Sequence, residues 1–194
     1  MSTDKKLAHI VLQTGQLPVL RDWYLKVLDA HVVYENEFLS FMTFDDENHR
    51  LAIAQLPQPA PRSPATVGLA HSAYTFPNIG SLLTKYEALR KVGIAPHVPV
   101  QHGPTTSIYY RDPDGNMVEL QIDNFTTPDE ATEYLRGKEF HADPFGPSFD
   151  PDAMLAALRA GTPESELLTR VWARTCPQRN VRNLCWLEPN SATP

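Results

Sequence analysis

The sequence contains few cysteines, no long apolar run and no excess of basic residues, and each absence excludes a class of protein. Its two cysteines, Cys176 and Cys185, are not spaced like the ligands of a zinc site. No apolar run approaches the roughly 20 residues that span a bilayer, and the N-terminal residues lack the apolar core of a signal peptide. A net charge of -6 provides no basic face for nucleic acid. We therefore expect a cytoplasmic protein that binds neither nucleic acid nor a membrane, with reduced thiols, a disulfide being the alternative.

The sequence does contain an internal repeat. The triplet Leu-Ala-His opens an alternating segment at residues 7–14 and again at residues 69–76. Each segment is followed by a helix with an apolar stripe and then by three short strands. In the first unit the expected helix is 18–30 and the expected strands are 7–14, 31–34, 38–44 and 50–56. In the second unit the expected helix is 79–92 and the expected strands are 69–76, 97–100, 107–110 and 117–122. Two βαβββ units predict an α+β fold whose paired, mostly antiparallel strands form an open, barrel-like sheet.

Domain boundaries follow from composition. A proline-rich connector, PQPAPRSPA, separates the repeat at residues 5–60 from the repeat at residues 67–124. We expect the two repeats to form one domain over residues 1–125. Residues 126–194 then form a C-terminal helical arm and an extended tail.

Three helices are expected in this arm. Thr127 and Glu130, three positions apart, form a capping box for the first. The second follows Asp150-Pro151, and the third runs from about residue 162 to Trp172. The aromatic, proline-rich segment FHADPFGPSF, after the first helix, is expected to pack without regular structure.

Two histidines and one glutamate occupy positions that predict a metal site. His9 and His71 stand at the same place in the two repeats, and Glu119 lies inside the last strand. If the repeats pair about a pseudo-twofold axis, their first strands lie side by side and the two histidines approach one point. Two histidines and a carboxylate form the facial triad of non-haem Fe(II) oxygenases, which leaves positions open for substrate and dioxygen. Each residue alone is better explained as structural, but the joint pattern favours the metal.

With these residues the sequence resembles the vicinal oxygen chelate superfamily, which includes glyoxalase I, bleomycin- and fosfomycin-resistance proteins and type I extradiol dioxygenases. The resemblance covers about residues 5–125. Isomerase-like members take a fourth metal ligand from the last strand of the first unit, where this sequence offers only Gln55. The missing carboxylate favours the three-ligand dioxygenase branch, with Fe(II) as cofactor and Mn(II) as a possible substitute. Gln55 keeps the four-ligand alternative open.

The resemblance to one-domain extradiol dioxygenases also implies three catalytic residues. His49, in the run His-Arg-Leu-Ala, matches the acid–base histidine of the family. Tyr109 stands ten residues before Glu119, like the family's tyrosine beside the metal site. His102 resembles a second active-site histidine, although it lies closer to Tyr109 than in the family pattern.

The implied reaction is the cleavage of an aromatic diol by dioxygen, between a hydroxylated carbon and its unhydroxylated neighbour. Two alternatives remain open, a glyoxalase-like metal-dependent isomerase or lyase and a non-catalytic small-molecule binding protein of the bleomycin-resistance kind. Short chains of this type commonly associate, so a homo-oligomer is expected. The ring itself is not identified by the sequence, because the aromatic residues that could line a pocket could equally form core: Phe38, Phe41, Tyr74, Phe145 and Phe149.

Overall fold

The computed structural model describes residues 5–60 and 67–181. The chain divides into two compact units, Met1–Arg62 with Asp112–Gly115 and Ser63–Arg111 with Asn116–Pro194. Each unit contains one of the predicted βαβββ repeats. Within the described ranges, no helix is long and apolar enough to cross a membrane.

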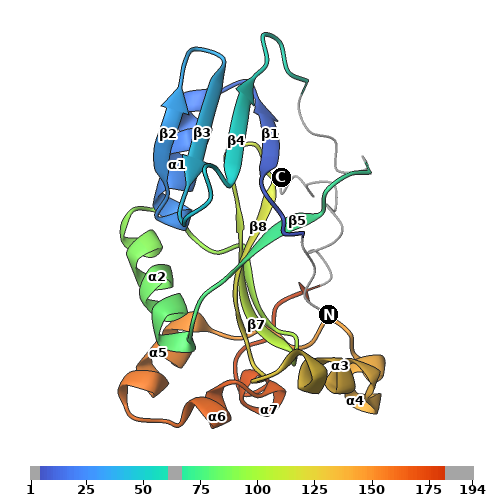
Figure 1. Cartoon of the computed structure of the whole chain (residues 1–194). Coiled ribbons are helices and arrows are strands. Elements are labelled where there is room, and N and C mark those ends of the chain that lie inside the picture. The colour runs from blue at the N-terminus through green and yellow to red at the C-terminus, as the bar shows by residue number, and fades with distance from the viewer. Residues whose placement is uncertain (1–4, 61–66, 182–194) are drawn as a thin grey trace, which may run out of the picture. The chain divides into compact units, whose positions relative to one another are not determined.

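The first unit is a four-stranded sheet with one helix across a face (Figure 1). Its strands stand in the order β1-β4-β3-β2, with β1 parallel to β4 and the other neighbours antiparallel. Helix α1 packs against β3 and β4 and buries Leu20, Tyr24 and Val27. The elements are β1 (Ile10–Thr14), α1 (Leu17–Leu28), β2 (His31–Glu35), β3 (Leu39–Thr43) and β4 (Leu51–Gln55).

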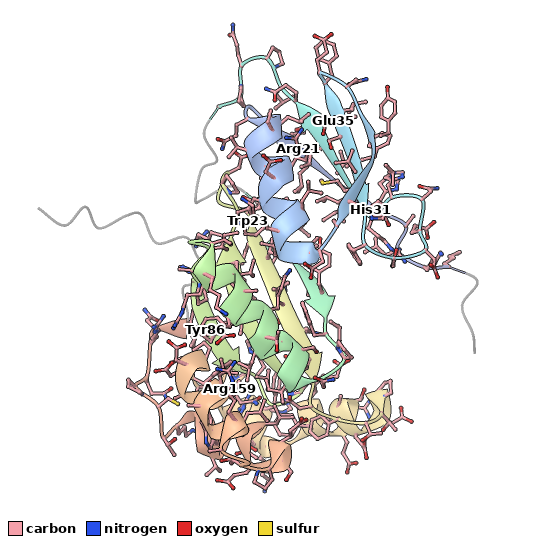
Figure 2. The ribbon with its side chains drawn as sticks, turned by 90° about the vertical axis from the view of Figure 1, so that its left-hand side faces the viewer. Arg21, Trp23, His31, Glu35, Tyr86 and Arg159 are labelled. Atoms are coloured by element: carbon pink, nitrogen blue, oxygen red, sulfur yellow. The ribbon has the colours of Figure 1, made fainter. Side chains whose placement is uncertain are left out.

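Polar contacts tie α1 to its surroundings in this unit. Arg21 on α1 forms an ion pair with Glu35 on β2, and Figure 2 shows the two side chains close together. The Tyr24 hydroxyl donates a hydrogen bond of 3.0 Å to the buried carboxylate of Asp112. The turn at residues 112–115 therefore packs with the first unit, although it connects two strands of the second.

The second unit repeats the same strand order, as β5-β8-β7-β6, with β5 parallel to β8. Asn78 caps its helix by accepting a hydrogen bond from the Ser81 amide, as the sequence predicts. The elements are β5 (His71–Thr75), α2 (Ile79–Lys91), β6 (Val98–Gln101), β7 (Thr105–Arg111) and β8 (Met117–Asp123). The identical order in both sheets confirms the internal repeat and the predicted α+β class.

A helical arm completes the second unit. Thr127 and Glu130 form the predicted capping box at its start. Arg159 on α5 pairs with Glu87 on α2, and Figure 2 shows Arg159 on the same side of the unit as Tyr86 of α2. The arm's helices are α3 (Pro128–Arg136), α4 (Lys138–Ala142), α5 (Pro151–Arg159), α6 (Glu164–Leu167) and α7 (Arg170–Ala173).

The arm differs from the sequence prediction in two places. The helix expected to reach Trp172 is divided into α6 and α7, because the Thr169 side chain donates to the Glu166 carbonyl and caps the Trp172 amide. Such local bonds compete with a continuous helix. The segment expected to lack regular structure begins inside α4, and its Ser148 pairs with Val100 at the edge of the sheet.

Of the two cysteines, Cys176 is buried with a free thiol, while Cys185 and most of the predicted tail lie outside the described residues.

Candidate active site

Strand register brings His71 and Glu119 onto one face of the second sheet. In the parallel pair of β5 and β8, Glu119 lies opposite Ala73, two positions after His71. Because alternate residues of a strand point to the same face, His71 and Glu119 are diagonal neighbours. The His71 Nε2 and Glu119 Oε2 atoms lie 3.0 Å apart. Glu119 is only 4% exposed, so its carboxylate is buried within the second unit.

The charges of this pair favour a deprotonated carboxylate. The hydrogen bond to Glu119 raises the pKa of His71, against the opposing effect of burial. Burial alone would raise the pKa of Glu119. Hydrogen bonds from His71 and Ser107, together with the charge of His71, outweigh this and lower the pKa of Glu119. Glu119 is therefore an anion, the form that a metal ligand must adopt.

The donor atoms of this pair fit a transition metal. Ligand bonds of about 2.1 Å place two adjacent donors at right angles about 3 Å apart, which matches the 3.0 Å between Nε2 and Oε2. Imidazole and carboxylate also suit iron, manganese and zinc. In the described part of the chain, no three His, Cys, Asp or Glu side chains are gathered closely enough to hold a metal. The pair could supply two of the three expected ligands, and the third, His9, belongs to the first unit.

Tyr109 lies directly beside Glu119 and connects it to His102. The antiparallel register of β7 and β8 places Tyr109 opposite Glu119. The Tyr109 hydroxyl lies 2.9 Å from His102 Nε2, and the Tyr109 ring stands edge-on to the rings of both His71 and His102. The second unit thus brings together four of the predicted site residues in one cluster.

The hydrogen bonds of His102 fix which nitrogen carries its proton. The ring also bonds to the backbone carbonyl of Phe145, and because Nε2 faces Tyr109, this bond uses Nδ1. A carbonyl can only accept, so Nδ1 carries the hydrogen and Nε2 is left as an acceptor. In this tautomer Tyr109 is the donor to His102 Nε2. Sequence reasoning missed Phe145 in this role because its contribution comes from the backbone.

Burial is the main effect on His102 and lowers its pKa. The charge of Glu119 and the hydrogen bond to the Phe145 backbone partly oppose it, and the positive charges of Arg170 and His71 add smaller decreases. The net pKa lies below the ordinary value of 6.5. His102 is therefore neutral at physiological pH and available as a hydrogen-bond acceptor or a base.

This lowered pKa predicts a pH effect on the stability of the metal-free protein. At pH values between the pKa of His102 in the folded protein and its ordinary value of 6.5, His102 is protonated in the unfolded chain but not in the folded protein. The free energy of unfolding therefore falls as the pH drops through this window. A His102→Gln variant retains an acceptor for Tyr109 but no longer titrates. Urea unfolding at about pH 7.5 and about pH 5.5 should show a larger acid-induced loss for wild type than for this variant. An equal loss in both proteins would contradict the assignment.

In the first unit, His9 and His49 lie together in a row of stacked rings. Their ring centroids are 4.3 Å apart, and the Phe41 ring stacks on the other side of His49 at 4.8 Å. His9 lies one residue before β1 and His49 shortly before β4, so the parallel pairing of these strands brings both to the same end of the sheet. His49 Nδ1 contacts the Asn48 side-chain oxygen. The structure therefore joins the expected acid–base histidine to an expected metal ligand.

Gln55, the only candidate for a fourth ligand, has another role. Its Oε1 accepts a 2.9 Å hydrogen bond from the Leu17 amide at the start of α1. Its Nε2 donates to the Leu56 carbonyl. The side-chain oxygen that would bind a metal is thus used at a helix end, which argues against the four-ligand alternative.

Comparison with known proteins identifies the family of the chain. A model of the Glyoxalase/Bleomycin resistance protein/Dioxygenase superfamily matches residues 6–120, and the chain belongs to this superfamily. Among solved structures, a lactoylglutathione lyase from Agrobacterium tumefaciens matches with a TM-score of 0.51 and 18% identity, covering 62% of this chain and 96% of that one. At this identity the likeness concerns the fold alone.

Curated relatives define the branch of the superfamily. Biphenyl-2,3-diol 1,2-dioxygenase 3 of Rhodococcus globerulus is 58% identical over 93% of this chain and 96% of the relative. Biphenyl-2,3-diol 1,2-dioxygenase 2 of the same organism is 55% identical over 89% of this chain and 92% of the relative. The chain is accordingly an extradiol ring-cleavage dioxygenase, an oxidoreductase that opens catechol-type rings with dioxygen and depends on a metal.

Proposed function

We propose that this enzyme cleaves a biaryl diol such as 2,3-dihydroxybiphenyl, using Fe(II) held by His9, His71 and Glu119. The high identity to two biphenyl-2,3-diol dioxygenases supports the substrate class. The 3.0 Å contact between His71 and Glu119 is the observation that carries the metal site. His9 supplies the third ligand from the first unit, and Mn(II) is the alternative metal because the same donors accept both.

When bound, the metal supplies a Lewis acid that lowers the pKa of the diol hydroxyls and a position for dioxygen. The protein's own groups then control protons and orientation. Tyr109 presents its oxygen to a substrate hydroxyl while donating its hydrogen to His102 Nε2. A proton released by the substrate can therefore pass along this bond to His102, which is neutral and able to accept it.

His49 acts as the acid–base group of the first unit. The Asn48 oxygen beside Nδ1 can only accept, so Nδ1 carries the hydrogen and Nε2 is the basic atom. Stacking between Phe41 and His9 fixes the plane of the ring. A histidine held in this way can give and take a proton at Nε2.

We also propose the domain boundaries, the localisation and the oligomeric state that the sequence predicts. Residues 1–125 act as the catalytic domain, residues 126–194 as its arm, and the protein is a cytoplasmic homo-oligomer. Light scattering coupled to size-exclusion chromatography checks the oligomer, and a single-chain mass in solution would contradict it.

Anaerobic reconstitution tests the proposed function. The protein is loaded with Fe(II) or Mn(II) without oxygen, and 2,3-dihydroxybiphenyl, unsubstituted catechol and oxygen are then supplied. We expect stoichiometric oxygen uptake with a yellow ring-opened product, faster with the biaryl diol and with iron. Faster turnover of unsubstituted catechol would overturn the substrate proposal, and full activity with Mn(II) alone would overturn the choice of iron.

A further inference from the structure

The helical arm contains a buried cation that the reaction, as described so far, does not use. Arg170, the first residue of α7, is 4% exposed. A buried charge is costly unless it is paired, and among the described residues no carboxylate forms an ion pair with it. Its guanidinium carbon instead lies 5.6 Å from the centroid of the Tyr134 ring and 5.9 Å from that of the Phe140 ring. These rings come from α3 and α4, which lie at the same end of the second unit (Figure 1).

The two terminal nitrogens of Arg170 donate to backbone carbonyls, one of which belongs to the active site, while its buried Nε has no partner among the described residues. Nη1 donates to the Asp143 carbonyl at 2.9 Å, and Nη2 donates to the carbonyl of His102 itself. Because the guanidinium is a rigid planar fork, two bonds from it fix both acceptors in one geometry. The guanidinium thus links the arm to the residue whose ring accepts from Tyr109.

Two glycines allow the arm to approach the His102 loop this closely. Gly103 has a φ of +99°, and a Cβ there would lie 2.3 Å from the Tyr134 ring. Gly146 has a φ of +80°, and a Cβ there would lie 2.1 Å from the Gln101 carbonyl oxygen. Any other residue at these positions would push the arm away from the loop. Residues on both sides of His102 are therefore packed directly against the arm.

We propose that Arg170 is a positioning residue for catalysis, which holds the backbone of His102 so that the ring spans the Phe145 carbonyl and the Tyr109 hydroxyl. Stability alone does not explain the residue, because a buried cation can often be replaced by apolar groups of similar volume without loss. The hydrogen bond from Nη2 to the His102 carbonyl gives a reason for an arginine at this position, because an apolar side chain could not make it. This inference rests on the proposed role of His102 in ring cleavage, and it makes the arm part of the catalytic apparatus.

Steady-state kinetics of the Fe(II)-loaded enzyme test the proposal. Arg170→Met keeps the apolar stem and removes the donors, and we expect kcat to fall about 10- to 100-fold with a smaller change in KM, since displacing a catalytic group by about 1 Å has an effect of this size. Arg170→Lys keeps the charge and one donor and should recover part of kcat. Arg159→Gln, which removes an exposed cation of the same arm, should leave kcat at the wild-type value. Wild-type kcat in Arg170→Lys together with wild-type kcat in Arg170→Met would overturn the proposal.

A double-mutant cycle distinguishes positioning from general damage. If Arg170 acts through His102, then Arg170→Met should reduce kcat no further in a His102→Ala background. Losses that multiply in the double variant would overturn the proposal. Thermal unfolding of each variant identifies any that does not fold, and Arg170→Lys then takes the place of Arg170→Met in the cycle.

A readout that does not involve turnover comes from the metal-free protein. Nitrogen NMR of the His102 ring, assigned by its disappearance in His102→Ala, reports which ring nitrogen carries the proton. In Arg170→Met we expect a smaller fraction of the His102 ring to carry its hydrogen on Nδ1. We also expect the pKa of His102 to rise, because the positive charge of Arg170 is removed while the charges of Glu119 and His71 remain near the ring. Unchanged ring signals would overturn the proposal. If His102→Ala retains wild-type kcat, the proposed function of His102 fails, while the ring signals still test Arg170.

Discussion

A Glu119→Ala variant is expected to lose ring cleavage entirely and to bind Fe(II) at least about 100-fold more weakly than wild type. Changes to groups that merely support metal ligands already weaken binding about 10- to 100-fold, and Glu119 is the proposed anionic ligand. Its carboxylate is buried and held 3.0 Å from His71 Nε2. Iron content after gel filtration, together with oxygen uptake on 2,3-dihydroxybiphenyl, measures both effects.

A matched control lies on the same strand. Asp123, at the end of β8, is exposed, so Asp123→Ala removes a carboxylate from β8 without touching the His71 pair. This variant should retain iron and activity. If Glu119→Ala retained its iron while Asp123→Ala lost it, the assignment of the metal site would be wrong.

A His49→Ala variant is expected to lower kcat by about 10²- to 10⁴-fold, the usual contribution of a general acid–base group. Iron binding should change little, because His49 is proposed to move protons and not to bind the metal. Its ring packs between His9 and Phe41, so a modest loss from altered packing of His9 is included in this range. Oxygen-electrode kinetics and iron analysis on the same samples separate the two effects.

His31→Ala provides the comparison for His49. His31 is an exposed histidine at the start of β2 in the same unit, and its removal should leave kcat unchanged. Parallel loss of iron and activity in His49→Ala would assign His49 to the metal instead of to proton transfer. Full activity in His49→Ala would exclude it from the reaction.

Much of the second-unit site could be predicted because strand register is encoded in short-range patterns. Glu119 stands in an apolar strand and His71 at the head of another, so pairing the two strands in parallel brings both side chains to one face. The structure also accounts for the spacing between His102 and Tyr109, which is shorter than in the family pattern. The turn between β6 and β7 is tight, with the His102 amide bonded to the Thr105 carbonyl, and Tyr109 still reaches His102 at 2.9 Å.

The remaining features depend on tertiary contacts that leave no local signal. In the sequence Arg170 is an ordinary residue of the third helix expected in the arm, and only the folded arm reveals that it is buried with a hydrogen bond to the His102 carbonyl. Gln55 has a side-chain oxygen that could bind a metal, but this oxygen accepts a hydrogen bond from the Leu17 amide at the start of α1. The break between α6 and α7 arises from the side-chain bonds of one threonine, Thr169, which compete with a helix that the pattern alone would continue.

The central claim is that His9, His71 and Glu119 together hold the iron. Iron anomalous diffraction from crystals of the Fe(II)-loaded protein tests it most directly. The claim predicts a single strong iron peak bonded to one nitrogen from each of the two histidines and to the Glu119 carboxylate, with Gln55 still bonded to the Leu17 amide. A peak elsewhere, or one bonded to Gln55 or lacking His9, would contradict it.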